Sequence, residues 1–510
     1  MHVLVVGSGG REHALVWKLR QSPRIEKLFC TPGNPGIAAL AETAPINAGD
    51  TRGLLEFARV NRIGLAVVGP EQPLAAGIAD EFQKAGIRLF GPHRRSAELE
   101  WSKAFAKEFM RRHRIPTAAF RSFTAAQKAD AAAYCASSPL PVVLKADGLA
   151  AGKGVMVCGS HEEALEALGL LTDADAFGNA GGTIVIEEFL EGVEASVFAV
   201  TDGIDYVTLP PAQDHKRALD GDLGKNTGGM GAYAPSPMVT QAVMDMIRRG
   251  IIEPTLRGME SEGRLYRGCL YVGVMLTAAG PRVVEFNCRF GDPETQVVLP
   301  LYDGDLLDLL VAACDGKVGH IPEPTPPAGS AACVVIASGG YPDNFQTGKR
   351  IAGLDLVSSG EGIMVFHAGT RREQDGSLVT AGGRVLGVTA VCSEGPLSAA
   401  VESAYEAVGK ITFEGMHFRR DIARQALTYS PGCTDDPRVN MDHTGRGAGG
   451  AGRCGSRSAF GPVHVGRTGV SPYGAATPRP GGVTRLERRQ GGAGSALSVV
   501  PRRADGDRGN

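Results

Sequence analysis

The chain has 510 residues, too many for a single hydrophobic core, and its length favours about three or four domains. Its hydrophobic share is 43%, its charged share is 21% and its formal net charge is -2, so charge gives no reason to expect nucleic acid or an acidic membrane as partner. Small-molecule chemistry is expected instead. Ten cysteines without zinc spacing, no signal-peptide pattern and no apolar stretch of membrane-spanning length predict a cytoplasmic protein.

The first hundred residues alternate short apolar runs with helical patterns. Helices are predicted near residues 11–20 and through Ile78 and Phe82, and strands at residues 2–6, 28–30, 65–70 and 87–92. Such alternation is typical of a parallel sheet covered by helices. Residues 1–100 are therefore predicted to form an N-terminal parallel α/β domain.

Beyond residue 100 the pattern changes. A helix (SKAFAKEFMRRH), strands (PVVLKADG, VMVC, TIVIEEFL) and a second helix (HEEALEALGLL) predict a two-layer subdomain at 123–186 within a central domain of residues 101–122 and 187–325. The proline-rich IPEPTPPAG marks a linker to a β-rich C-terminal domain at 326–428. Residues 429–510 are rich in glycine and arginine, lack periodicity and are expected to be disordered. The predicted fold class is thus α/β and α+β multidomain.

The turn GSGGREHA places Gly7, Gly9 and Gly10 between a strand and a helix, where backbone N–H groups and the helix dipole can hold an anion. The dinucleotide fingerprint would need glycine at position 12, where Glu12 stands, so a sugar phosphate is favoured over NAD. A tight turn without any ligand is the alternative.

The run KADGLAAGKG places Lys145 at the end of a strand and Lys153 beside Gly152 in a glycine-rich loop. Two ammonium groups there can meet phosphate oxygens as point charges. The spacing excludes a P-loop, because only three residues separate Gly148 from Gly152 and Gly154 follows the lysine. Taken alone, such a loop is more often a solvated turn.

In VVEFNCRFGDPET, strand alternation puts Glu285, Asn287 and Arg289 on one face and apolar side chains on the other. A carboxylate and an amide oxygen two residues apart suit a hard cation such as Mg²⁺, which fills its shell with phosphate oxygens and water. The arginine can fork onto a carboxylate or phosphate. An ordinary half-exposed strand with a charged face is the alternative.

Two further segments carry candidate binding groups. QDHKR and NTGGMGAY can bind an amino acid, with Asp214 for the ammonium and loop N–H groups or Arg289 for the carboxylate; a surface loop is the alternative. In and after VIEEFL lie Glu187, Glu188 and Glu194, where strand backbone groups can read an adenine edge and Glu194 can bind ribose hydroxyls. An acidic strand end is the alternative there.

Taken in this order, GSGGREHA, PGNPG, VGPEQPL, VLKADGLAAGKGV, EEFLEGVEAS, QDHKR, NTGGMGAY and EFNCRFGDPETQ resemble the GAR synthetase (phosphoribosylamine-glycine ligase) family, over about residues 1–427. The resemblance implies an ATP-grasp module whose lid subdomain carries Lys145 and Lys153. It also implies a monomer that uses ATP and Mg²⁺ or Mn²⁺ to join glycine to 5-phosphoribosylamine through glycyl phosphate, giving glycinamide ribonucleotide for purine biosynthesis.

The resemblance assigns a role to each matching position. For catalysis it implies Lys153, Asp214 and Arg289. For the metal it implies Glu285 and Asn287. For ATP it implies Lys145, Gly152, Lys153, Glu187, Glu188, Leu190 and Glu194. For glycine and phosphoribosylamine it implies Gly9, Gly10, Arg11, Asp214, Lys216, Gly229, Arg289 and Asp292.

Two features depart from the family pattern. Trp101 stands where a small residue is usual, and the tail beyond Leu427 has no counterpart, so a chain stopped after Tyr429 is expected to fold and work.

Three alternatives remain open. They are another ATP-grasp carboxylate-amine ligase or carboxylase, an oxidoreductase, which Glu12 disfavours, and a non-catalytic binding protein, which the intact Lys145 and Glu285 disfavour.

Overall fold

In the computed structural model, the described residues are 1–149, 154–172, 182–357 and 362–429. The predictions for Gly152, Lys153 and the tail from residue 430 lie outside them. The chain separates into two compact units, residues 1–443 and 444–510, and every described residue belongs to the first. Within this described part, none of the helices is long and apolar enough to cross a membrane.

The N-terminal region forms a sheet of parallel strands in the order β3-β2-β1-β4-β5. The strands are β1 (His2–Gly7), β2 (Lys27–Pro32), β3 (Glu42–Thr43), β4 (Ile63–Val68) and β5 (Arg88–Phe90). The helices are α1 (Gly10–Leu19), α2 (Thr51–Val60), α3 (Glu71–Ala76), α4 (Ile78–Lys84) and α5 (Arg94–Trp101). Val3 to Val6 are fully buried, as expected for a central strand covered on both faces. The predicted parallel α/β region is confirmed.

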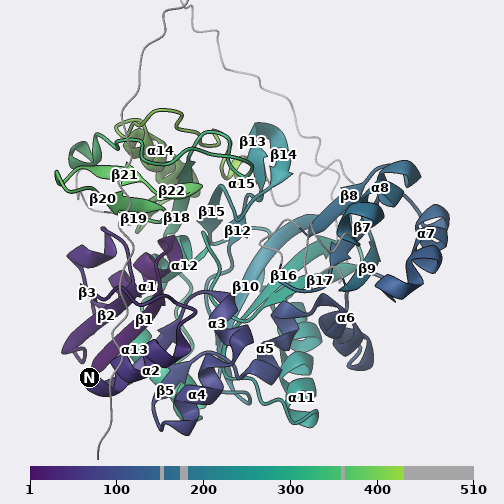
Figure 1. Ribbon diagram of the computed structural model, residues 1–510, viewed down its shortest axis with the longest axis horizontal. Coiled ribbons are helices and arrows are strands. Elements are labelled where there is room, and N and C mark those ends of the chain that lie inside the picture. The colour runs from purple at the N-terminus through teal and green to yellow at the C-terminus, as the bar shows by residue number, and fades with distance from the viewer. Residues whose placement is uncertain (150–153, 173–181, 358–361, 430–510) are drawn as a thin grey trace, which may run out of the picture. The chain divides into compact units, whose positions relative to one another are not determined.

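A second sheet follows, with antiparallel strands in the order β6-β9-β7-β8. Its strands are β6 (Phe120–Thr124), β7 (Val142–Ala146), β8 (Val155–Cys158) and β9 (Thr183–Glu188), and helices α7 (Lys128–Ser137) and α8 (His161–Leu171) lie together beside it (Figure 1). Leu144 and Ile186 pack in the core under these helices. Because strand side chains alternate, Lys145 and Glu187 project from the opposite face, toward the centre of the molecule.

The central sheet is antiparallel in the order β11-β10-β16-β17. Its strands are β10 (Val193–Thr201), β11 (Tyr206–Thr208), β16 (Gly268–Thr277) and β17 (Gly280–Asn287). The helices in this part of the chain are α6 (Lys103–Arg112), α10 (Gln241–Ile247), α11 (Glu253–Ser261), α12 (Thr295–Leu301) and α13 (Leu306–Asp315). A π-helical turn at Arg248–Ile252 joins α10 to α11. Glu285 and Asn287 are among the last residues of β17.

The remaining large sheet has the order β12-β15-β18-β22-β19. Its strands are β12 (Gln213–Asp214), β15 (Gly231–Ala234), β18 (Ser330–Ala337), β19 (Ile363–His367) and β22 (Arg384–Cys392), followed by helices α14 (Leu397–Val408) and α15 (Arg424–Thr428). Two hairpins are attached, β13 (Arg217–Leu219) with β14 (Leu223–Asn226) and β20 (Thr370–Arg372) with β21 (Leu378–Thr380). Since β12 and β15 precede the proline-rich segment, this sheet ties QDHKR to the last folded part of the chain.

Candidate active site

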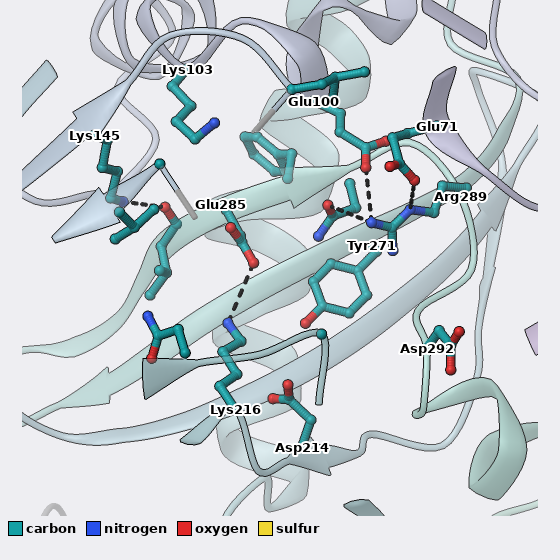
Figure 2. A pocket seen from close by; sticks show the side chains of 18 of the residues that line it. Glu71, Glu100, Lys103, Lys145, Asp214, Lys216, Tyr271, Glu285, Arg289 and Asp292 are labelled. Atoms are coloured by element: carbon teal, nitrogen blue, oxygen red, sulfur yellow. Dashed lines mark hydrogen bonds and ion pairs between the residues drawn. The ribbon is translucent and has the colours of Figure 1, made fainter. Parts of the chain in front are cut away.

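One cavity of about 610 Å³ opens between the four groups of elements described above, a volume ordinary for a small-molecule site. Side chains from α6, β7, β9, β17 and β22 meet there. The structure brings together at its wall nine of the predicted site residues: Arg11, Lys145, Glu187, Asp214, Lys216, Glu285, Asn287, Arg289 and Asp292. Figure 2 shows Lys145 and Asp292 on opposite sides of the view, with Glu285 and Lys216 pointing toward each other between them.

At one end of the cavity two lysines share one carboxylate. The Glu187 carboxylate forms ion pairs with Lys145 Nζ at 3.0 Å and with Lys107 Nζ at 2.8 Å. Lys107 also donates to Thr117 Oγ1 at 2.8 Å. The exposed fractions of the Lys107 and Glu187 side chains are 3% and 4%, so water screens these charges little. Burial lowers the pKa of Lys107 to about 8, although Glu187 opposes the shift.

Lys103 adds a third ammonium group to this end. It is the first residue of α6, and its Nζ donates to the carbonyl oxygen of Gly148 at 2.9 Å. Ser102 caps the helix by accepting the N–H of Phe105. Asp147, next to Gly148, accepts the N–H of Ala104 at 3.0 Å, so the residues beside Lys103 and Gly148 are held together. Burial lowers the pKa of Lys103. We call Lys103, Lys107 and Lys145 the lysine end.

In the middle of the cavity, carboxyl groups outnumber lysines. Lys216 Nζ lies 3.3 Å from Glu285 Oε1 and also contacts Glu194, and Asp214 stands two residues before Lys216, at the end of β12. Lys216 lowers the pKa of Glu285 to about 2, against the effect of burial. Burial raises the pKa of Asp214 well above its usual range. Burial alone would lower the pKa of Lys216, but these carboxylates hold it well above its ordinary value. We call Glu194, Asp214 and Glu285 the carboxylate centre.

The predicted metal ligands fit a hard divalent cation. Glu285 offers an ionised carboxylate, and Asn287, two residues along β17, offers an amide oxygen on the same wall of the cavity. Asn287 Oδ1 accepts from Arg289 Nη2 at 3.2 Å. Within the described part of the chain, no three His, Cys, Asp or Glu residues form a cluster that could hold a metal alone. A cation here would therefore draw most of its ligands from phosphate and water, as Mg²⁺ does.

Arg289 binds protein carboxylates in the structure. Its Nη2 lies 3.0 Å from Glu100 Oε1 and its Nε lies 3.6 Å from Glu71 Oε2 (Figure 2). Glu100 also accepts the N–H of Cys288 at 2.7 Å. Burial alone would lower the pKa of Arg289, but Glu100 and then Glu71 raise it. The guanidinium thus ties the end of β17 to α3 and α5, an arrangement that sequence reasoning did not anticipate.

At the far end, Asp292 is held by two residues from other elements. Arg384 Nη2, from β22, lies 3.0 Å from Asp292 Oδ2, and Gln296 Nε2 donates to Asp292 Oδ1 at 2.7 Å. Arg11 lines the same region and donates to the carbonyl oxygen of Phe290 at 3.2 Å. Burial alone would raise the pKa of Asp292, but Arg384 and then Arg11 hold it below its ordinary value. An ionised carboxylate between two guanidinium groups suits a ligand that carries both an amine and a phosphate.

Family models match this chain in succession. They are the phosphoribosylglycinamide synthetase N domain at residues 1–100, its ATP-grasp (A) domain at 101–295 and its C domain at 331–425. The chain belongs to the phosphoribosylglycinamide synthetase family. The predicted family and its ATP-grasp module are thereby confirmed.

Named relatives of this synthetase family agree over the same region. The phosphoribosylamine–glycine ligase of Chlorobaculum tepidum is 51% identical over 431 residues, which are 84% of this chain and 100% of the relative. That of Allochromatium vinosum is 50% identical over 430 residues, 84% of this chain and 99% of the relative. The crystal structure of the Thermotoga maritima phosphoribosylamine–glycine ligase has a TM-score of 0.70 at 36% identity and covers 83% of this chain and 100% of its own.

Six predicted residues of the synthetase site are described but are not among those that line the cavity: Gly9, Gly10, Glu188, Leu190, Glu194 and Gly229. The N–H of Gly9, predicted to meet a phosphate, donates to Glu12 Oε2 at 2.5 Å. A Cβ at Gly10 would lie 2.7 Å from Gln296 Nε2, so this glycine allows close packing behind Asp292. Glu188 turns away, accepting the N–H of Ala119 and pairing with Arg282, both at 2.9 Å.

Sequence reasoning missed several cavity residues: Glu71, Glu100, Lys103, Lys107, Tyr341 and Arg384. One signal was available for Lys103. A lysine directly after a serine N-cap opposes the helix dipole, which favours anions at that end, and such a placement suggests a ligand-binding role. Glu100 and Arg384 gave no comparable signal, because their partners Arg289 and Asp292 are far away in the chain.

Proposed function

We propose that this chain joins glycine to 5-phosphoribosylamine with hydrolysis of ATP, giving glycinamide ribonucleotide, ADP and phosphate in de novo purine biosynthesis. Support comes from family membership and from relatives that carry the name phosphoribosylamine–glycine ligase at about half identity over their whole length. The observation that carries the proposal is the cavity itself. It joins a lysine end to Asp292 and Arg384 through the carboxylate centre.

The proposed reaction has two steps. A carboxylate oxygen of glycine attacks the γ-phosphorus of ATP, the bond from that phosphorus to the bridging oxygen breaks, and ADP leaves. The sugar amine then attacks the carbonyl carbon of glycyl phosphate, loses a proton and expels inorganic phosphate. Both steps depend on positioning and charge neutralisation, so no nucleophilic side chain is needed.

For the first step the lysine end supplies the charge. Lys103 and Lys145 face the cavity and would neutralise phosphate oxygens, while Lys107 and Glu187 orient Lys145. Glu285 and Asn287 would hold Mg²⁺ or Mn²⁺, which when bound adds positive charge beside the β- and γ-phosphates. The remaining predicted nucleotide contacts lie at Glu188, Leu190 and Glu194. Backbone groups at the end of β9 would bind the adenine edge, and Glu194 would bind the ribose hydroxyls.

The carboxylate centre would bind glycine before the first step, and Asp292 would bind the sugar amine for the second. Asp214 would accept the glycine ammonium, with Lys216 beside it for the carboxylate. Arg289 would act by holding the end of β17 through Glu71 and Glu100. Asp292 would accept a hydrogen bond from the sugar amine.

The sugar phosphate would lie at the far end of the cavity. Arg11 and Arg384 would bind it, with Gly9, Gly10 and Gly229 shaping that wall. We also propose the domain division 1–100, 101–122 with 187–325, 123–186 and 326–428, and a cytoplasmic monomer.

Glycine-dependent ADP release tests the proposal. Phosphoribosylamine is generated in situ, and each substrate is omitted in turn. Wild type should release ADP only in the complete mixture, and Glu285→Ala should lose this activity while Glu402→Ala, an exposed glutamate on α14, keeps it. ADP release that is independent of glycine would sink the proposal and direct the search to other acids and amines.

A further inference from the structure

The segment QDHKR, which runs from β12 to the start of β13, presents residues 213–216 alternately to two sides. Asp214 and Lys216 line the cavity, whereas Gln213 and His215 are buried on the other side. That other side is covered by the end of the folded chain, residues 417–425. We call this segment the C-terminal clamp.

Hydrogen bonds join the clamp to residues 213–222 along its length. His417 Nε2 donates to the carbonyl oxygen of Ala218 at 2.7 Å, and Gln213 Nε2 donates to Gln425 Oε1 at 3.1 Å. Between them lie three further backbone contacts: Gly221 N–H to Asp421 Oδ2, Arg420 N–H to Asp220 Oδ1 and Ala423 N–H to His215 Nε2. About two hundred residues of chain separate the partners, so this wall of the cavity forms only when the C-terminal part has folded.

Arg419 is the centre of the clamp. Its side chain is 1% exposed, and its guanidinium binds Asp421 through Nε and Nη2, both at 2.8 Å. The remaining nitrogen, Nη1, donates to Asp222 Oδ1 at 2.7 Å and to the carbonyl oxygen of Arg217 at 3.2 Å. A buried guanidinium with all three nitrogens bound fixes its partners in both distance and direction.

His215 depends on the same neighbour. Burial and then the charge of Arg419 lower the pKa of His215 to about 4, so the ring is neutral at physiological pH. A neutral ring is required here, because Nε2 accepts the N–H of Ala423 at 3.2 Å and a protonated ring could not. Arg419 thus supports both residues that flank Lys216, His215 before it and Arg217 after it.

We propose that Arg419 is a positioning residue for Asp214 and Lys216, acting through the backbone of residues 215–222. The inference rests on the proposed function and adds to it a residue that does not line the cavity. Lys216 must stay between Glu194 and Glu285, and misplacement by about 1 Å can cost about a hundredfold in rate. Among the described residues, no hydrogen bond or ion pair joins the clamp to the lysine end, so the groups that neutralise the phosphates of ATP should be spared.

The test compares Arg419→Met with Arg420→Met, the same change at the next residue, whose side chain is exposed. For Arg419→Met we expect kcat over KM for glycine to fall by about tenfold or more while the Kd for ATP stays within about twofold. Arg420→Met should match wild type in both. Arg419→Lys should recover part of the loss, since it keeps the charge but not the fork.

A structural readout separates this inference from the proposed function. Hydrogen exchange should speed up at residues 213–222 in Arg419→Met and not in Arg420→Met, even if wild type shows no glycine-dependent ADP release. Should Arg419→Met fail to fold, Asp222→Asn removes one partner, and its 51% exposed side chain makes the change tolerable. Unchanged glycine kinetics in folded Arg419→Met or in Asp222→Asn, or an equal loss of ATP affinity, would overturn the inference.

Discussion

The lysine end and the carboxylate centre of the cavity have opposite charge ratios. At the lysine end Lys107 and Lys145 share Glu187 and Lys103 adds a third ammonium group, whereas at the carboxylate centre Glu194 and Glu285 share Lys216 beside Asp214. Each side therefore has an excess of one charge, and screening by water is weakest at the lysine end, where Lys107, Lys145 and Glu187 are buried. The first is built to attract an anion such as a triphosphate, and the second to attract a cation such as a metal ion or an ammonium group.

The largest effect should come from breaking the carboxylate centre. Glu285→Gln keeps the shape but removes the charge that holds the cation, so the ADP release rate should fall by about a hundredfold or more. Raising the Mg²⁺ or Mn²⁺ concentration should restore part of the rate if the defect is weak cation binding. Steady-state kinetics at several metal concentrations measure this, and an unchanged metal dependence would contradict the assigned role.

The lysine end should respond differently. In Lys107→Met, Lys145 is the only lysine left to pair with Glu187, so its ammonium group is held more tightly by the protein and is less free to bind phosphate. The Kd for ATP should therefore rise by about tenfold. The KM for glycine should change far less. Calorimetric titration with ATP gives the first value and steady-state kinetics the second. Equal changes in both would show that the two regions are not separable.

The lowered pKa of Lys107 predicts that the stability of the protein depends on pH. Its pKa is about 8 in the folded protein and near 10.5 unfolded, so between these values the unfolded state binds more protons and stability rises with pH. The free energy of unfolding of wild type, measured relative to Lys107→Met, should therefore increase from about pH 8 towards 10.5. Urea titrations at several pH values measure it. A flat difference would mean that Lys107 keeps its ordinary pKa.

The smallest effect should come from removing the tail. A chain stopped after Tyr429 keeps every residue of the C-terminal clamp, and the family match ends at residue 425, so ATP affinity and glycine kinetics should both match the full chain. A chain stopped after Gly415 lacks the clamp and should lose glycine-dependent activity. Loss of activity or solubility already at Tyr429 would give the tail a structural role.

Much of the fold followed from local patterns. The alternation of apolar runs with helical patterns in the first hundred residues predicted β1, β2, β4 and β5 but not the two-residue β3. The alternation in VVEFNCRF predicted that Glu285 and Asn287 share a face. The order of strands in the last sheet did not follow, since β15, which also pairs with β12, pairs with β18 across the proline-rich linker. Pairing between distant strands leaves no periodic signal in either segment.

The candidate site was predictable to a similar degree. The side chains of Lys145, Asp214 and Glu285 indicated which ligand groups they could bind, but the sequence did not show which residues would lie next to them. Arg289 looked free for a substrate, yet Glu100 binds it at 3.0 Å. The N–H of Gly9 looked free for a phosphate, yet the carboxylate of Glu12 accepts it. A buried charge takes the nearest partner that the fold supplies, and that partner is set by tertiary structure.

The central claim is that a nucleotide held at the lysine end meets glycine held at the carboxylate centre. Glycine labelled with ¹⁸O in its carboxylate tests it most directly, with the phosphate released by the complete reaction analysed by mass spectrometry. Transfer of one carboxylate oxygen from glycine to each inorganic phosphate is the predicted result, because the acyl phosphate breaks at its carbonyl carbon. Unlabelled phosphate beside a product that carries one label, with the second carboxylate oxygen lost to water, would contradict the account.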